Sequence, residues 1–194
     1  TAYYKCLIKC NYPGNWVIFY IGSYIMSYKT IIYAKELIKN INNEDFIIFD
    51  CRCDISNSSY GIDAYNDGHI ENSIFIDIDH DLASEKTITS GRHPLPDPQL
   101  LAEKLSQWGM SNNKQAIVYD DAGGAFAGRM WWILKWLGHD NVAVLDGVLG
   151  AWMSSGGKLS TKTTVFERSV FTPRVNDDMH VSIKDVEEAQ YKMN

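Results

Sequence analysis

The chain has 194 residues, of which 45% are hydrophobic and 22% are charged, and its formal net charge is −6 at pH 7. This composition excludes an intrinsically disordered chain, and the acidic balance offers no electrostatic attraction to nucleic acid or to an anionic membrane surface. We therefore expect neither as a partner. The length corresponds to one full domain with a surplus, since domains run to roughly 100–200 residues.

All four cysteines, Cys6, Cys10, Cys51 and Cys53, lie within the first 53 residues. This distribution predicts no disulfide framework, and the spacing without nearby histidines fits no common zinc site. We expect no metal and no other cofactor. A reduced chain in the cytoplasm is the expected setting.

Residues 1–29 are predicted to form an extension outside the folded domain. Their apolar run, residues 15–25, is too short to span a bilayer. A secretory signal would need a stronger basic region than Lys5 and Lys9, and small residues at a cleavage site. A genuine signal or anchor is the alternative interpretation.

From residue 30 onward, patterns typical of helices and of buried strands alternate. Apolar residues at helical spacing predict a first helix from Ala34 to Ile41. Continuous apolar runs predict buried strands at residues 46–49, 74–76, 116–119 and 142–145. Further helices are predicted between the N-cap Asp97 and Gly109, over residues 127–137, and over residues 147–155. The fold class is therefore α/β, with a parallel central sheet and helices on both faces, over residues 30–157.

The alternation stops after residue 157. Residues 158–180 are rich in Thr, Ser and Lys and are predicted to be a linker. Ser182 and Asp185 then have the spacing of a capping box at a helix start. The segment from Val181 to Val186 also echoes residues 32–37, so we expect residues 181–194 to begin a second, truncated copy of the domain.

Aspartates follow all four predicted strands, at the sheet edge where active sites of parallel α/β domains lie. These residues are Asp50, Asp77, Asp120 and Asp146. We interpret all but Asp120 as turn formers or helix caps.

Asp120 opens a loop that leads into a helix and contains Asp121, Gly123 and Gly124. Such a loop offers free backbone N–H groups and the positive end of a helix dipole, which stabilise an anion or a thiolate. The loop has no cysteine, and the Asp120 carboxylate would fill the anion site. Arg129, further along the helix, is predicted to form a structural ion pair with Asp120 or Asp121.

Several short motifs now follow one another in a recognisable order. They are Tyr65-x-x-Gly68-His69-Ile70 with Asn72-Ser73, His93-Pro94-Leu95-Pro96, Val118-Tyr119-Asp120, Arg129-x-Trp131-Trp132, Leu137-Gly138-His139, Leu145-Asp146-Gly147 and Ala151-Trp152. Together they resemble the rhodanese family, and above all the first domain of two-domain thiosulfate and 3-mercaptopyruvate sulfurtransferases. Val148 departs from the second glycine that usually follows Leu-Asp-Gly.

The resemblance implies a division of labour between two tandem domains. The second domain carries a cysteine that becomes a persulfide, taking sulfur from thiosulfate or 3-mercaptopyruvate and passing it to cyanide or a thiol. Asp120 stands at the position of that cysteine, so this chain would be the non-catalytic half, inactive alone. Its partners would be the second rhodanese domain of the same polypeptide and a small sulfur-containing substrate. The alternative is a stand-alone inactive rhodanese-like module that binds a protein partner.

His69 has two interpretations. The first is structural, with the imidazole hydrogen-bonded to backbone. The second, suggested by the mercaptopyruvate enzymes, places His69 at the partner domain's site, with Asp63 or Asp67 fixing its tautomer.

The remaining aromatic and thiol side chains are given structural interpretations. Trp131, Trp132 and Trp136 are predicted to pack in the core or at a domain interface. A catalytic thiol at Cys51 or Cys53 is the least favoured hypothesis, because no helix N-terminus is evidently aimed at either residue.

Overall fold

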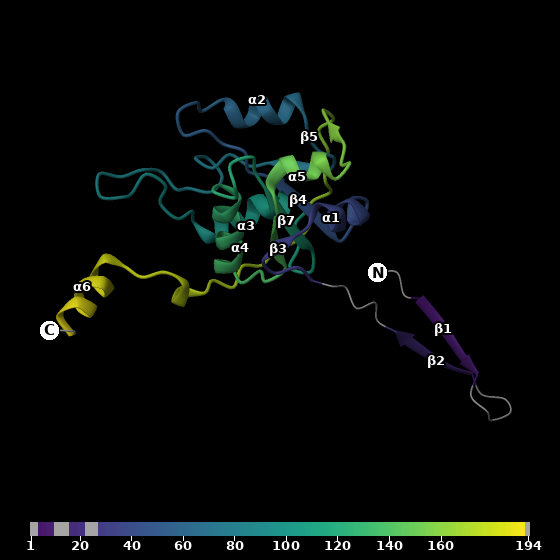
Figure 1. Cartoon of the computed structure of the whole chain (residues 1–194). Coiled ribbons are helices and arrows are strands. Elements are labelled where there is room, and N and C mark those ends of the chain that lie inside the picture. The colour runs from purple at the N-terminus through teal and green to yellow at the C-terminus, as the bar shows by residue number, and fades with distance from the viewer. Residues whose placement is uncertain (1–3, 10–15, 22–26, 193–194) are drawn as a thin grey trace.

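A computed structural model describes residues 4–9, 16–21 and 27–192 (Figure 1). Its centre is a sheet of five strands in the order β3-β8-β7-β4-β6, and every neighbouring pair in it is parallel. The strands are β3 (Ile31–Ile32), β4 (Phe46–Asp50), β6 (Ser73–Phe75), β7 (Gln115–Tyr119) and β8 (Val142–Leu145). The predicted α/β fold with a parallel central sheet is confirmed.

Helices cover both faces of this sheet. They are α1 (Ala34–Asn40), α2 (Tyr60–Asp67), α3 (Pro98–Gln107), α4 (Ala127–Trp136) and α5 (Val148–Ser154). Asp97 caps α3 as predicted, since its side chain accepts the N–H groups of Gln99 and Leu100. Short connections between strands and helices leave the loops at the carboxyl ends of the strands free to form a site.

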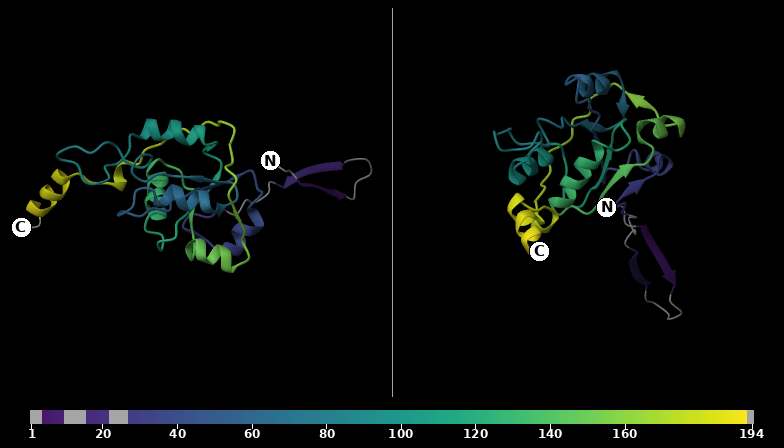
Figure 2. Two further views of the ribbon diagram at one scale, coloured as in Figure 1. Left: turned by 90° about the horizontal axis from the view of Figure 1, so that it is seen from above. Right: turned by 60° about the vertical axis from the view of Figure 1, so that its left-hand side comes forward.

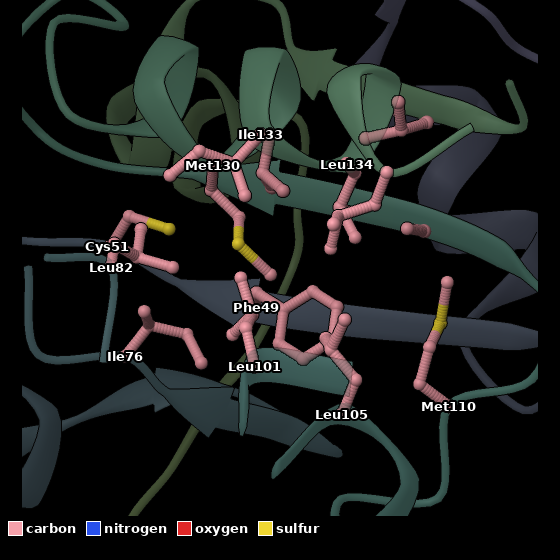
Figure 3. Packing of buried hydrophobic residues seen from close by; sticks show 14 of the residues in the cluster. Phe49, Cys51, Ile76, Leu82, Leu101, Leu105, Met110, Met130, Ile133 and Leu134 are labelled. Carbon is pink, nitrogen blue, oxygen red and sulfur yellow. The ribbon is translucent and has the colours of Figure 1, made fainter. Parts of the chain in front are cut away.

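Side chains alternate along the strands and divide the core into two clusters. On one face, Phe49 and Val118 pack with residues of α3 and α4. Figure 3 shows Met130 of α4 above Phe49 and Leu105 of α3 below it. On the other face, the neighbouring strand residues pack with α1 and α5. Both faces are therefore buried, which explains the continuous apolar runs in the sequence.

The segment predicted to be a linker packs against the domain over much of its length. It contains β9 (Leu159–Ser160), which pairs with β5 (His69–Ile70). Further along, Phe171 is buried in the core. Backbone hydrogen bonds continue to Asn176, whose N–H donates to the Trp136 carbonyl. We call residues 158–176 the strap.

The two ends of the chain form separate elements. Strands β1 (Tyr4–Lys9) and β2 (Trp16–Ile21) pair with each other, and the rest of the predicted extension up to residue 26 lies outside the described residues. After a short helix η1 (Asp177–Met179), α6 (Ile183–Lys192) extends away from the sheet (Figure 2). Within the described residues, no helix has the length and apolar character that crossing a membrane requires.

Candidate functional site

The carboxylate of Asp120 lies at the centre of the loop between β7 and α4 and is fully buried. Its Oδ1 accepts the N–H groups of Ala122 at 3.0 Å and Gly124 at 2.9 Å. Its Oδ2 accepts those of Phe126 at 2.9 Å and Ala127 at 3.0 Å. The loop therefore wraps its own first side chain with four backbone donors.

Two consecutive glycines allow this wrapping. Gly123 and Gly124 have φ angles of +72° and +87°, in the left-handed region that glycine adopts without strain. Amides converging in this way at a helix start form an anion-binding arrangement. Because Asp120 already occupies these four donors, they are not available to an external anion.

Asp121 points outward and connects the loop to α2. The Tyr60 hydroxyl donates a hydrogen bond to its Oδ2. That hydrogen bond, together with partial burial, raises the pKa of Tyr60. Asp121 is thus placed at the surface of the loop, while Asp120 is enclosed by it.

The predicted ion pair of Arg129 with Asp120 or Asp121 is wrong. The guanidinium instead donates to the carbonyls of Leu82, at 2.6 Å from Nη2, and of His93, at 3.1 Å. It also reaches the Pro94 carbonyl. Arg129 therefore links two parts of the segment between β6 and α3. Asp120 is compensated by backbone amides and not by this cation.

A second buried carboxylate, Asp50, lies at the end of β4, next to β7. Asp50 is paired in register with Tyr119, the residue before Asp120. The Arg52 guanidinium donates to both Asp50 oxygens, with Nη2 2.7 Å from Oδ2, and the Tyr119 hydroxyl donates to Oδ2 at 2.6 Å. Asp50 was interpreted as a turn former or cap, and the structure shows that it also anchors this buried network.

The network continues toward the start of β5 and β6. Arg52 donates to the Gly68 carbonyl at 2.8 Å, and the Tyr119 oxygen accepts the Ile70 N–H at 3.2 Å. Burial and the nearby Asp50 charge hold the pKa of Tyr119 well above its usual value, so the phenol stays neutral. This network was not predicted, although the Asp50-x-Arg52 spacing after an apolar strand is a signal for it.

His69 is buried, and each of its ring nitrogens lies near a backbone carbonyl oxygen. Its Nδ1 lies 2.7 Å from the Tyr65 oxygen and its Nε2 lies 3.1 Å from the Lys162 oxygen. Its ring stacks on that of Tyr65 at 3.8 Å. These contacts agree with the structural interpretation of His69, whereas its place at a partner domain's site stays a prediction. The predicted fixing of its tautomer by Asp63 or Asp67 is wrong, since carbonyl oxygens lie at both ring nitrogens.

Comparison with known proteins identifies the family of this fold. A family model described as the rhodanese-like domain matches residues 33–155, more than half of the chain. The chain belongs to the rhodanese family.

Relatives of this rhodanese chain carry sulfurtransferase names. A probable 3-mercaptopyruvate sulfurtransferase of Pseudomonas aeruginosa is 43% identical over 134 residues, covering 68% of this chain and 47% of the relative. Thiosulfate/3-mercaptopyruvate sulfurtransferase 2 of Arabidopsis thaliana is 32% identical over 133 residues, covering 68% of this chain and 38% of the relative. The chain thus spans about half the length, or less, of these relatives.

A solved structure agrees with these relatives. The crystal structure of SseA from Escherichia coli, described in terms of the rhodanese fold and the catalytic mechanism of 3-mercaptopyruvate sulfotransferases, matches with a TM-score of 0.76 at 26% identity. The match covers 85% of this chain and 63% of SseA. The sulfurtransferase branch of the family is therefore supported by sequence and by structure.

The cysteines of the rhodanese domain are poorly suited to nucleophilic chemistry. Cys51 is fully buried, and burial followed by the Asp50 and Asp120 charges raises the pKa of its thiol well above the usual value. Burial and the charges of nearby aspartates also raise the pKa of Cys53. Because the thiolate is the reactive form, neither site is arranged for catalysis.

The three tryptophans of α4 pack as predicted. Trp136 is buried and stacks with Trp132 at 6.1 Å, and its indole Nε1 has no hydrogen-bond partner among the described residues. Trp131 is half-buried, and its Nε1 donates to the carbonyls of Lys29 and Val142. Their place is in and beside the core.

The other two strand-end aspartates differ from Asp120 in having little enclosure. Asp77 acts as a turn former, accepting the N–H groups of Asp79 and His80. Asp146 is exposed. Within the described ranges, no cluster of three or more His, Cys, Asp or Glu side chains is arranged to hold a metal ion.

Proposed function

We propose that this chain is the non-catalytic first rhodanese domain of a tandem sulfurtransferase. The reaction would transfer sulfur from thiosulfate or 3-mercaptopyruvate to cyanide or a thiol, through a cysteine persulfide on a second domain. The rhodanese-like domain would span residues 30–157, and the second domain would begin at residue 181. This chain would pack against that domain and support its cleft.

The observation that carries the proposal is the enclosure of Asp120. A persulfide mechanism needs a thiolate in the loop between β7 and α4, held by backbone amides. Here a carboxylate occupies that position and accepts four of the amides itself. A carboxylate cannot carry the sulfur as a persulfide, so the loop supports structure and not sulfur transfer.

The repeat at the end of the chain supports a second domain. Aligning Val181 with Ile32 places Ile183 of α6 opposite Ala34 of α1. Ala34 is buried against the sheet, whereas Ile183 is 77% exposed. A second sheet beside α6 would bury Ile183 in the same way, in keeping with a relative of which the matched part of this chain covers less than half.

The two thiols of the rhodanese-like domain support a proposal for the cellular compartment. Cys51 and Cys53 are both free although they lie two residues apart. Unpaired thiols are typical of reducing compartments, and we propose a cytoplasmic location.

The test is a sulfur-transfer assay of the 194-residue chain, with thiosulfate and cyanide in one series and 3-mercaptopyruvate and a thiol in the other. We expect no turnover and, by intact mass spectrometry after incubation with either donor, no added sulfur atom. The positive control is the Pseudomonas aeruginosa relative.

Turnover by the isolated chain would contradict the proposal, and variants identify its source. Activity lost in Asp120→Ala would place the chemistry in the loop, while activity lost in Cys51→Ser or Cys53→Ser would restore the thiol hypothesis. The binding-module alternative is tested by adding the half of the Pseudomonas relative that this chain does not match. Association with restored turnover supports the tandem assignment, and no association favours the module.

A further inference from the structure

The central sheet has an open edge at β3. This strand comes first in the strand order and, among the described residues, pairs only with β8. The carbonyls of Thr30 and Ile32 accept the N–H groups of Val144 in β8 and of Asp146 directly after it. The parallel register therefore turns the N–H and C=O of Ile31 away from β8, and an unpaired backbone edge of this kind is a template for an added strand.

A groove of about 480 Å³ lies beside this edge. Its walls come from β3, β8, the Asp120 loop and α4, and include Ile31, Gly123, Trp131, Val144, Asp146 and Val148. Gly123 has no side chain, and the space beside it is open, since a Cβ there would meet no atom within 4 Å. The indole of Trp131 is held in place by its hydrogen bonds to Lys29 and Val142.

One uncompensated charge borders the apolar walls. Asp146 is exposed, and its carboxylate forms no ion pair within the described part of the chain. The Lys135 ammonium, which lies over the Trp131 ring at 5.8 Å, is paired with Asp140 at 3.0 Å. The groove thus has apolar walls and the negatively charged side chain of Asp146 at its border.

The backbone is strained at the turn that borders the groove. Val148 has a φ of +55°, which is a rare conformation for a β-branched residue, and it follows Gly147 at +72°. Strain of this kind persists where the surrounding structure fixes it and concentrates at functional sites. It lies here at the turn that carries Asp146 past the groove.

We propose that this groove binds an extended peptide segment of a partner protein by strand addition to β3. The added strand would bond to the Ile31 backbone, insert an aliphatic side chain between Trp131 and Val144, and place a lysine or arginine beside Asp146. Main-chain bonds supply affinity in this mode, and alternate side chains supply selectivity. The proposal does not depend on the sulfurtransferase assignment.

The experiment uses the ¹⁵N-labelled 194-residue chain and the probe acetyl-Thr-Val-Thr-Lys-Thr-amide, whose Val and Lys share one face of a strand. We expect saturable amide shifts at Ile31, Gly123, Gly124 and Gly147. Asp146→Asn is expected to weaken binding about threefold, as for an exposed ion pair. The matched variant Asp45→Asn, at the opposite end of the sheet, is expected to leave binding unchanged.

Two altered probes test the binding mode. A probe with Glu in place of Lys is expected to bind more weakly, and a probe with N-methylated backbone amides is expected not to bind. Equal binding of the methylated probe, shifts located elsewhere, or no shifts at millimolar peptide would each overturn the proposal. Shifts at Ile31 that depend on protein concentration without peptide would assign the groove to a second copy of this chain, which would also overturn it.

Discussion

Asp50 and Asp120 close neighbouring strands of one sheet, and both carboxylates are fully buried. Asp50 is compensated by two side chains, the guanidinium of Arg52 two residues along and the hydroxyl of Tyr119 on the neighbouring strand. Asp120 is compensated only by backbone amides within the seven residues that follow it. A buried carboxylate can thus be compensated by other side chains or by the backbone amides of its own loop. In the second case the neighbouring side chains remain free for other contacts.

The largest expected effect is on the network. Asp50→Ala leaves the Arg52 charge buried without its partner, and we expect a loss of about 3–5 kcal/mol in the free energy of unfolding. Urea unfolding followed by circular dichroism measures it. The double variant Asp50→Leu/Arg52→Met, which removes both charges, is expected to lose less. A single-variant loss below about 1 kcal/mol would mean that the pair behaves as an exposed one.

The loop is expected to show a smaller loss. Asp120→Ala deprives four amides of their acceptor, but water can enter and satisfy part of them, so we expect about 2–3 kcal/mol. Hydrogen exchange at Gly124 and Ala127 should accelerate in the same variant. Asp121→Ala, which removes the exposed neighbour, is expected to cost about 0.5 kcal/mol. Equal losses in the two variants would show that enclosure of Asp120 contributes nothing.

Replacing Tyr119 tests whether Asp50 is held by a shared network of side chains. Tyr119→Phe removes one donor to Asp50 and the acceptor of the Ile70 N–H, with an expected loss of about 1–1.5 kcal/mol. In a double-mutant cycle with Asp50→Ala, the two losses should fail to add by about 0.5–3 kcal/mol, as for groups in contact. Full additivity would contradict a shared network.

The smallest expected effect concerns the turn beside the Asp120 loop, where the Leu149 N–H donates to the Asp120 carbonyl. Val148→Gly and Val148→Ala both remove the half-buried side chain, but only glycine adopts a φ of +55° freely. We expect the glycine variant to be more stable than the alanine variant by about 1 kcal/mol, measured by thermal unfolding. The usual order, with alanine more stable, would show that the backbone is relaxed at this position.

The regular part of the fold was predictable because its signals are local and repeated. Strand β7 contains the continuous apolar run 116–119, and α3 follows an aspartate N-cap and begins with proline, and both signals have a short-range physical cause. The position of Asp120 at a strand end was predicted from the apolar run before it. Its carboxylate was predicted to occupy the anion site of the loop because the loop leads from a strand into a helix.

The errors concern partners that are distant in sequence. Arg129 bonds to carbonyls 35 to 47 residues away, and no periodicity marks a carbonyl as an acceptor. The polar composition of the strap predicts a linker and gives no sign of its packing against the domain. Its attachment depends on one buried aromatic, Phe171, and on backbone hydrogen bonds, which composition does not reveal.

The strap has a mechanical consequence for any domain that follows it. The ring of His180 still meets that of Trp136 at 6.2 Å, and only Val181 and Ser182 separate it from α6. A domain beginning at α6 would therefore have almost no slack in its tether, and its effective concentration at this face would approach its maximum. The short tether would limit how far such a domain could move from this face.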